Sequence, residues 1–423
     1  MHGTDGAGPI IDIADLAEPV LTDFQRETVA AALAHPVEVS VEAVLEGARA
    51  ATGLDDFGDD AFRARLAVMI AAIREDEGMS ALRHADLMGM FTRHAIARLR
   101  LEDLVRRHPE ILDIAIERPI IVAGLPRSGT THLLGLLGAD ERLRSLPWWE
   151  AMAPFPGPED AATAEDPNPR WTRAAEGWTW FDRLLPHMKA MHGFDPDHIS
   201  EDIELQALDF SSYLIEWFAY VPRWRDFYLA QDQSGPYAYL KKAMQALTFL
   251  RGSNRWVIKC PQHLEQLEVL KKTFPDAVFV LTHRDPVASI QSAITMTSYF
   301  DRIFRKTVDV AMRTKYWIDR YGVLLRRCVD QRGCLPEDST LDVYFHEWIR
   351  DPDPVLTEIY RMAGIPLTDE VRAKLHAYIA ANPADRHGKV VYNLRRDCGV
   401  TPEEVRAGFG FYMERFPVKV EVR

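Results

Sequence analysis

The 423-residue sequence has few cysteines, no long apolar run and no excess of basic side chains. Its four cysteines are scattered and form no C-x-x-C pair, which argues against a disulfide scaffold and against a zinc site of that spacing. The longest apolar stretch, residues 111–125, is interrupted by charged residues and a proline, whereas a membrane-spanning helix needs about 20 apolar residues. The first residues lack the basic and apolar segments of a secretory signal, so we expect a cytoplasmic protein without a membrane span.

The sequence carries 50 Lys and Arg against 63 Asp and Glu, a formal net charge of −13. A protein that coats nucleic acid usually has the opposite balance, because its cations displace phosphate counterions, so we expect no nucleic-acid partner. Residues 1–60 contain 13 of the acids and 2 of the bases, which leaves 50 acids and 48 bases in residues 61–423. The acidity therefore belongs to the beginning of the chain, and the remainder is nearly neutral.

Residues 21–107 have apolar side chains every three or four positions, most clearly in residues 62–73 and 88–104. This spacing predicts amphipathic helices. No motif in this part of the sequence indicates chemistry. We expect residues 1–117 to form a helical, acidic N-terminal extension that has an accessory role or holds a homodimer together.

Four later segments have the composition of strands that are buried on both faces of a parallel sheet, being short and rich in β-branched residues. They are residues 119–123, 256–259, 278–282 and 341–345. Helical patterns alternate with them, which favours an α/β fold with a parallel sheet flanked by helices. We expect this domain over residues 118–423, with a helical, aromatic-rich insertion at about residues 154–250 that faces the substrate.

Residues 124–131, Gly-Leu-Pro-Arg-Ser-Gly-Thr-Thr, lie between the first predicted strand and the following helix. Backbone N–H groups of such a turn converge on an anion. The glycine spacing matches the nucleotide phosphate-binding loop G-x-x-x-x-G, but Thr130 replaces the lysine after the second glycine, and Arg127 is the cation. A guanidinium suits a shorter cluster of oxyanions than a triphosphate. The alternative is a turn that merely requires glycine.

The run G-L-P-R-S-G-T-T after I-I-V-A resembles the 5′-phosphosulfate loop of sulfotransferases that use 3′-phosphoadenosine 5′-phosphosulfate (PAPS). A second segment, residues 279–292, resembles the 3′-phosphate segment of the same family, with Arg284 at the end of a strand and Ser292 eight residues later. The similarity covers residues 119–416 and points to the bacterial branch. It implies a P-loop-like sulfotransferase fold, with PAPS as cosubstrate and no metal.

The resemblance implies roles for individual residues of these segments. The 5′-phosphosulfate would be held by Arg127, Ser128, Gly129, Thr130 and Thr131. Arg127 would also act as a catalytic group that stabilises the departing phosphate. Arg284 and Ser292 would bind the 3′-phosphate, and Lys389 near the C-terminus would reach the same phosphate.

Sulfuryl transfer to a hydroxyl needs a base for the hydroxyl proton. Glu150 is the first candidate, because family members with an arginine in the loop place a catalytic glutamate just past the first helix, and Glu150 follows Arg127 by 23 residues. The alternative is that Glu150 pairs with a neighbouring arginine. His263 is the second candidate, although the cytosolic branch has Lys-x-His and here Lys259 and His263 stand four apart. Lys259 itself binds the sulfuryl group or caps the sheet.

Five acids and histidines lie close together in the insertion: His192, His198, Glu201, Asp202 and Glu204. Only His198 and Asp202 are four residues apart, so the pattern does not favour a metal site. Ser200 followed by two acids is typical of a helix N-terminus, with Ser200 as its cap. The resemblance places an acidic segment near the acceptor, which gives one of these acids a role in orienting substrate.

Two other functions stay open. An ATP-dependent P-loop kinase would need the lysine that Thr130 replaces, and the kinase-like triplet at residues 283–285 is not followed by the expected asparagine. A catalytically silent nucleotide-binding protein would lack a base, whereas Glu150 and His263 are both present. The sequence favours a sulfotransferase that acts on a hydroxyl of a small-molecule or lipid-like acceptor.

Overall fold

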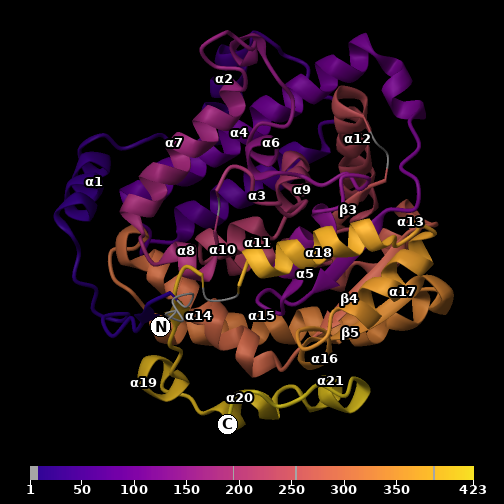
Figure 1. Ribbon diagram of the computed structural model, residues 1–423. Helices are drawn as coiled ribbons and strands as arrows, with labels where there is room; N and C mark the ends of the chain where they lie inside the picture. Colours follow the sequence, from indigo (N-terminus) through magenta and orange to yellow (C-terminus); the bar gives the residue numbers. More distant parts are fainter. Residues whose placement is uncertain (1–7, 194, 253–254, 384–385) are drawn as a thin grey trace, which may run out of the picture.

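A sheet of four parallel strands forms the centre of the computed structural model, which describes residues 8–193, 195–252, 255–383 and 386–423. The strand order is β3-β2-β4-β5 (Figure 1). The strands are β2 (Ile120–Gly124), β3 (Val257–Lys259), β4 (Val278–His283) and β5 (Thr340–Tyr344). They coincide with the four predicted segments, and the predicted α/β fold with a parallel sheet flanked by helices is confirmed.

Helices cover both faces of the sheet, which explains why the strands are mostly apolar. Ile120 and Val122 of β2 pack into a cluster on one face, and Ile121 and Ala123 pack into a cluster on the other. The helices of the first cluster are α5 (Thr130–Gly138), α17 (Asp353–Ala363) and α18 (Asp369–Ala381). Those of the second include α12 (Ser234–Arg251), α13 (Leu267–Thr273), α14 (Pro286–Phe304) and α15 (Val310–Gln331).

The carboxyl ends of β2, β3 and β4 meet at one edge of the sheet. Strand β2 lies between β3 and β4, so the connection from β2 to β3 runs to one side of β2 and the strands β4 and β5 lie on its other side. Ligands of open α/β sheets bind at such a point. The segments that follow these strand ends are residues 124–131, the residues after Lys259, and Arg284, so the topology brings three predicted site segments together.

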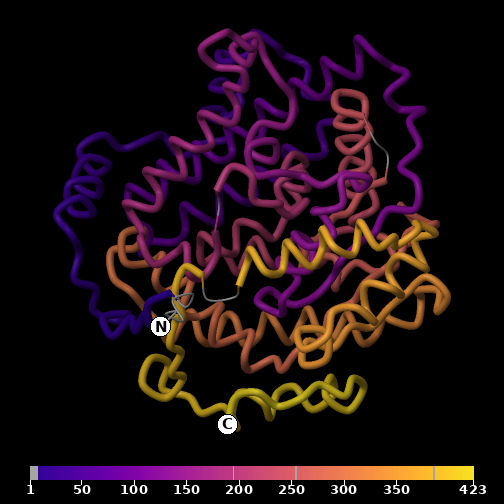
Figure 2. Tube along the Cα trace, viewed as in Figure 1, coloured from indigo at the N-terminus to yellow at the C-terminus, as the bar shows by residue number. Residues whose placement is uncertain are grey.

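The first quarter of the chain is helical. Its helices are α1 (Asp23–Ala34), α2 (Val41–Thr52), α3 (Ala61–Glu75) and α4 (Ala81–Arg107), which confirms the helices predicted at residues 62–73 and 88–104. Apolar side chains of α2, α3 and α4 form a separate cluster with Ile215, Trp224 and Tyr228 of the insertion. Figure 2 shows these two parts of the trace, indigo to purple and magenta, together in the upper half of the molecule.

The insertion between β2 and β3 is a series of mostly short helices. They are α6 (Trp148–Met152), α7 (Pro169–Leu184), α8 (Met188–Met191), α9 (Ile203–Gln206), α10 (Leu214–Phe218) and α11 (Pro222–Ala230), followed by α12. The longest of the new elements, α7, begins after Asn168, whose side chain accepts a hydrogen bond from the Trp171 N–H (3.3 Å). Pro169 at its first position suits a helix start, because proline has no N–H to satisfy there.

The two ends of the described chain lie near each other. Strand β1 (Ile10–Ile11) pairs in parallel with β6 (Lys389–Val390), after which come α19 (Leu394–Cys398), α20 (Pro402–Ala407) and α21 (Gly410–Arg415). The backbone N–H groups of Glu421 and Val422 then donate to the Asp285 carboxylate, at 2.9 and 3.3 Å. The last residues are thereby fixed beside Arg284, at the edge of the sheet where the predicted site segments meet.

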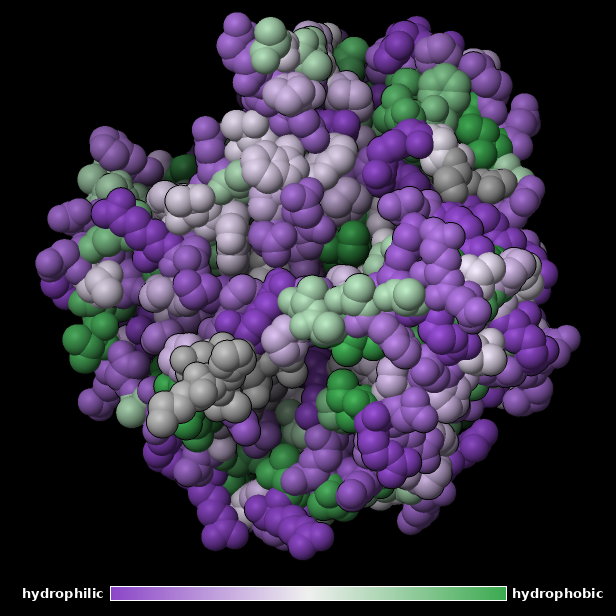
Figure 3. All heavy atoms as spheres, in the orientation of Figure 1, coloured by the Kyte–Doolittle hydropathy of each residue, from purple (hydrophilic) through white to green (hydrophobic). Residues whose placement is uncertain are grey.

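Hydrophilic side chains cover most of the face seen in Figure 3, and the hydrophobic ones are divided into separate groups. Over the part of the chain that the structure describes, we find no helix with both the length and the apolar character needed to cross a bilayer.

Candidate active site

The loop after β2, residues 124–131, is shaped by bonds within itself. The buried Ser128 donates its N–H and its hydroxyl to the Leu125 carbonyl, at 3.2 and 2.6 Å, and its hydroxyl lies 2.9 Å from that of Thr282. Ser128 therefore fixes the loop and does not line the cavity described below. Its role in holding phosphosulfate stays a prediction.

Two residues of this loop have left-handed backbone: Gly129 with φ of 85° and Arg127 with φ of 67°. Gly129 has no room for a side chain, because a Cβ there would lie 2.9 Å from the ring of Phe345 and 3.0 Å from that of Trp348, in α16 (Phe345–Trp348). Arg127 is not glycine, and such a backbone costs a non-glycine residue about 1–3 kcal/mol, which is typical of functional loops. Helix α5 starts immediately afterwards at Thr130, so its first unpaired N–H groups face this turn.

Arg127 connects the loop to the segment after β4. Its Nε donates to the Ser292 hydroxyl (3.0 Å), and its carbonyl accepts a hydrogen bond from Nη1 of Arg284 (2.6 Å). The two segments that the sequence predicts to bind the 5′ and 3′ ends are thus in direct contact.

Arg284 and Ser292 each have a partner from the C-terminal part of the chain. The Arg284 guanidinium lies 3.9 Å from the ring centre of Phe345 and donates to the carboxylate of Glu421, with Nη2 at 2.7 Å. Ser292 donates to the Tyr392 hydroxyl at 3.0 Å. Lys389, the predicted phosphate ligand of this region, is exposed in β6. Tyr392 lies three residues later and contacts Ser292, although no sequence motif indicates it.

Lys259, the last residue of β3, is 1% exposed and points to the loop. Its Nζ donates to the Thr131 hydroxyl (3.2 Å) and forms an ion pair with the Glu201 carboxylate. The structure thus shows Lys259 in contact with the loop after β2, and its role with the sulfuryl group stays a prediction. One ammonium group therefore joins the loop to an acidic residue of the insertion.

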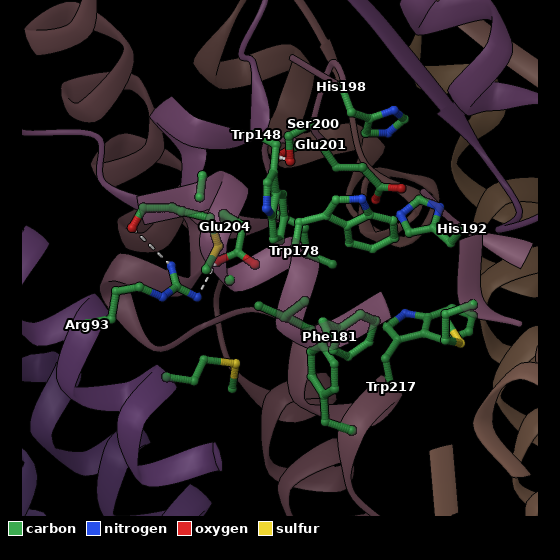
Figure 4. Close-up of a pocket in the computed structure, with 18 of the residues that line it drawn as sticks. Arg93, Trp148, Trp178, Phe181, His192, His198, Ser200, Glu201, Glu204 and Trp217 are labelled. Atoms are coloured by element: carbon green, nitrogen blue, oxygen red, sulfur yellow. Dashed lines mark hydrogen bonds and ion pairs between the residues drawn. The ribbon is translucent and has the colours of Figure 1, made fainter. Parts of the chain in front are cut away.

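A cavity of about 650 Å³ lies beside the loop. One part of its lining, here called the loop wall, consists of Arg127, Thr130, Thr131, Glu201 and Lys259. Another part, here called the aromatic wall, includes Trp148, Trp178, Phe181 and Trp217 (Figure 4). In Figure 4, Trp178 lies between Glu201 and Phe181, so the two walls adjoin. The cavity combines a polar, cationic end with a chamber suited to an apolar molecule.

A charged corner lies at another edge of the aromatic wall. Arg93 of α4 donates to Glu204 (3.1 Å) and to the Met152 carbonyl (3.4 Å), and the His94 ring nitrogen Nε2 lies 2.9 Å from the same Glu204 oxygen. Burial alone would raise the pKa of Glu204, but the charge of Arg93 and the hydrogen bond from His94 outweigh it and lower the pKa to about 2. Helix α4, in which the sequence indicates no chemistry, thus contributes an arginine to the cavity.

Glu150, the first candidate for the base, lies outside the cavity lining. It is 2% exposed and pairs with Arg144 at 2.8 Å and with Arg251 at 3.0 Å. Burial raises the pKa of Glu150, and the charge of Arg144 opposes that rise. The structure therefore shows the alternative stated for this residue, a carboxylate paired with neighbouring arginines, and does not bring Glu150 to the loop wall.

His263, the second candidate, lies in the turn after β3 and is fully buried. Its Nδ1 is 2.9 Å from the Tyr237 hydroxyl, and its Nε2 is 3.2 Å from the Asp202 carboxylate. It does not line the cavity. The histidine thus contacts the buried side chain of Asp202 rather than the cavity.

The segment of acids and histidines around Ser200 differs from its prediction. Ser200 does not cap a helix: its hydroxyl donates to the Glu201 carbonyl (3.4 Å), and α9 starts only at Ile203. His192, His198 and Glu201 line the cavity. Burial lowers the pKa of His198 to about 4, and burial with the charges of nearby cations lowers the pKa of His192 well below its usual value. The described residues contain no cluster of three or more side chains that could hold a metal ion.

Comparison with known proteins identifies the fold that builds this site. Residues 119–369 match the model of the sulfotransferase family. The chain belongs to the sulfotransferase family. Over 281 residues it is 25% identical to omega-hydroxy-beta-dihydromenaquinone-9 sulfotransferase Stf3 of Mycobacterium tuberculosis (strain CDC 1551 / Oshkosh), which covers 63% of this chain and 68% of that protein. The protein of the same name from Mycobacterium bovis matches equally.

Two solved sulfotransferases resemble the whole molecule. Sulfotransferase STF9 from Mycobacterium avium is 27% identical, with a TM-score of 0.81 over 91% of this chain and 99% of that one. Sulfotransferase STF1 from Mycobacterium tuberculosis H37Rv is 29% identical, with a TM-score of 0.77 over 88% of this chain and 98% of that one. The likeness extends beyond residues 119–369, and the predicted relation to bacterial sulfotransferases is confirmed.

Proposed function

We propose that this sulfotransferase moves the sulfuryl group of PAPS to a hydroxyl of a small-molecule or lipid-like acceptor by in-line transfer. The observation that carries the proposal is the loop wall itself. Arg127, Lys259 and the N-terminus of α5 give a positive end to an otherwise apolar cavity. An anionic donor at that end would meet an apolar acceptor in the chamber next to it.

The residues present fit the two anionic ends of this donor. Arg127, Thr130, Thr131 and Lys259 surround the place where the 5′-phosphosulfate would lie, and Arg127 and Lys259 would neutralise the charge that grows on the departing phosphate. Arg284, Ser292 and Tyr392 adjoin Arg127 and would receive the 3′-phosphate. The donor supplies the sulfuryl group, and the protein supplies cations, hydrogen bonds and orientation.

The same features count against an ATP-dependent kinase. Thr130 stands where a triphosphate-binding loop has lysine, and the cation of the loop is Arg127. Arg284 and Ser292 beside the loop would bind a 3′-phosphate, and ATP has no 3′-phosphate. Glu201 and Lys259 count against a catalytically silent binding protein. Both line the cavity, where they offer a carboxylate and a cation for a reaction.

The acceptor is proposed from the aromatic wall. A chamber lined by Trp148, Trp178, Phe181 and Trp217 favours flat rings or alkyl chains. The curated relative Stf3 is named for a hydroxylated menaquinone, which has both. We therefore expect an acceptor with one hydroxyl near Glu201 and an apolar body against the tryptophans.

The proposal is tested by transfer of ³⁵S from labelled PAPS to a panel of phenols, sterols and long-chain alcohols, with retention of the label in an organic-soluble product as the readout. Transfer to at least one apolar alcohol supports the proposal. Parallel reactions with ATP and magnesium and γ-³²P label test the kinase alternative. Phosphoryl transfer without sulfuryl transfer would overturn the proposal.

A further inference from the structure

We infer that Arg170 binds a carboxylate of the acceptor, at the end of the acceptor that is remote from the hydroxyl to be sulfated. The inference rests on the proposed function and specifies its acceptor as an apolar molecule with a hydroxyl at one end and an acid at the other. Besides Arg127, the described lining of the cavity includes Arg93, Arg170 and Arg173. Arg170 differs from the other two in having no carboxylate as a partner.

Arg170 lies beside the charged corner, at the end of α6. Arg93 of that corner donates to the Met152 carbonyl at 3.4 Å. Nη1 of Arg170 donates to the next two carbonyls of the chain, those of Ala153 (2.9 Å) and Pro154 (3.4 Å). The two guanidinium groups therefore bind consecutive carbonyls of one short segment, and both line the cavity.

Two tryptophans separate this part of the cavity from the loop wall. In Figure 4, Trp148 and Trp178 stand between the charged corner and Glu201. Helix α6 begins at Trp148 and ends at the segment that Arg170 binds, so it connects the aromatic wall to the arginine. An acceptor that lies along the tryptophans with its hydroxyl at the loop wall therefore has its other end near Arg170.

The arginines of this part of the cavity differ in how their charge is balanced. Arg93 pairs with Glu204 at 3.1 Å, and Arg173 pairs with Asp160. Among the described residues, no ion pair joins Arg170 to a carboxylate, and its hydrogen bonds go to backbone carbonyls. The charge of Arg170 is therefore the one that an incoming anion can balance.

The surroundings of Arg170 favour such an anion. The side chain is half-buried, and a guanidinium keeps its charge in proteins. Burial lowers the pKa of Arg170, and the more distant charges of Glu150 and Asp160 oppose that effect without cancelling it. The guanidinium also lies over the ring of Trp149, 4.7 Å from its centre, which orients the group without neutralising it. A partly desolvated cation of this kind gains from a carboxylate partner.

The number of charges and the shape of the guanidinium select the kind of anion. A carboxylate is planar, carries one negative charge and matches the fork of N–H donors of an arginine. A phosphate monoester carries between one and two charges, more than the single unbalanced cation of Arg170. We therefore expect hydroxy acids with an apolar body, such as phenols that carry a carboxylate on an alkyl chain.

The test uses 4-hydroxyphenylalkanoic acids of increasing chain length, each compared with its methyl ester. The ester keeps the phenol and the chain but removes the charge. At the chain length that reaches Arg170, kcat/KM for the acid should exceed that for the ester about 10-fold, the usual contribution of a hydrogen bond to a charged group. Calorimetry with the product nucleotide 3′-phosphoadenosine 5′-phosphate (PAP) bound should show the same preference in affinity.

Three variants locate the source of that preference. Arg170→Gln should lower kcat/KM for the acid about 10-fold and remove the preference over the ester. Arg170→Lys keeps the positive charge and should retain part of the preference. Arg173→Gln is the matched control and should retain all of it, because Arg173 lines the same cavity but is 46% exposed and already paired with Asp160.

Two results would overturn the inference. One is the absence of any preference for the acid, at every chain length, in the unchanged protein. The other is an equal loss for acid and ester in Arg170→Gln, which is expected if Arg170 only holds the carbonyls after α6. Failure of the proposed function looks different: the unchanged protein would bind no PAP and would transfer sulfate to neither acids nor esters.

Discussion

The loop wall and the aromatic wall border the same cavity but are built in different ways. The loop wall comes from strand ends: Arg127 follows β2, and Lys259 ends β3. Its geometry is fixed by the register of a buried sheet. The aromatic wall comes from α6, α7 and α10, helices of an insertion that contacts the N-terminal helices. From this difference we propose that the sheet edge sets the chemistry and that the helices set the choice of acceptor. Substitutions in either wall test the proposal.

The largest expected effect comes from removing the cation of the loop wall. Arg127→Ala should lower kcat about 10²–10³-fold, because it removes a donor that faces the charge developing on the departing phosphate. The matched control is Arg173→Ala, which removes an arginine that also lines the cavity but is 46% exposed and pairs with Asp160. Steady-state kinetics should show the control within about threefold of the unchanged protein. An equal loss of kcat in Arg127→Ala and Arg173→Ala would contradict a specific role of the loop wall in catalysis.

A smaller effect, on KM for the acceptor rather than on kcat, is expected from the aromatic wall. Trp178→Ala should raise KM for an apolar acceptor about 10-fold, since an aromatic contact contributes about 0.5–1.5 kcal/mol beyond the apolar area that is also lost. PAP affinity should not change. Trp171→Ala is the control on the same helix, because Trp171 is exposed and outside the cavity lining. A loss of PAP affinity in Trp178→Ala would contradict the separate roles of the two walls.

The charged corner beside the aromatic wall should affect stability more than catalysis. The folded pKa of Glu204, about 2, is below its usual value of 4.5, so its stabilisation is complete above about pH 5 and disappears as the pH falls towards 2. At pH 7, Glu204→Gln should lower the free energy of unfolding by about 1.5–3 kcal/mol, the range for hydrogen bonds to charged groups.

Urea unfolding at pH 7 and pH 3 measures this effect, and the deficit of Glu204→Gln should be smaller at pH 3. The ion pair of Arg100 and Glu159 offers a control, because the Glu159 side chain is 52% exposed and Glu159→Gln should change stability by less than about 1 kcal/mol. A deficit of Glu204→Gln that is constant with pH would show that the ionised carboxylate is not its source.

The smallest effect is expected beside the loop wall, at the contact between Arg284 and Glu421. A 3′-phosphate would have to replace the Glu421 carboxylate on the guanidinium. Glu421→Gln should therefore tighten PAP binding about 2–5-fold, the equivalent of a partly exposed ion pair. Glu414→Gln, an exposed glutamate of α21, is the control for calorimetry. Weaker PAP binding in Glu421→Gln would mean that Glu421 positions Arg284 for the phosphate.

The loop wall could largely be predicted from the sequence, and the reason is local. Arg127, Thr130 and Thr131 lie in one run between a strand and a helix, where the backbone conformation follows from the glycines and the strand ends determine what lies nearby. The fold was predictable for the same reason, because each strand is a short segment rich in apolar, β-branched residues. The hydrogen bonds of the Ser128 side chain within the loop could not be predicted, because a motif does not say which side of the loop a side chain takes.

The partners of the loop wall could not be predicted, because they come from distant segments without a motif. In the sequence, Glu201 after Ser200 has the pattern of an acid in the first turn of a helix. In the structure α9 begins only at Ile203, and Glu201 pairs with Lys259. Tyr392 is 100 residues from Ser292, and Arg93 is 111 residues from Glu204. Glu150 has the spacing expected of a base, but Arg144 and Arg251 bind its carboxylate away from the cavity.

The most direct test of the central claim is calorimetric titration of the protein with PAP and with AMP, which differ only in the 3′-phosphate. If Arg127 and its loop hold the 5′ end while Arg284, Ser292 and Tyr392 hold the 3′ end, PAP should bind at least about 10-fold more tightly than AMP, since one phosphate bonded to a cation contributes about 1.5–3 kcal/mol. Arg284→Ala should remove that difference and leave AMP binding unchanged. Equal affinity for PAP and AMP in the unchanged protein would contradict the account.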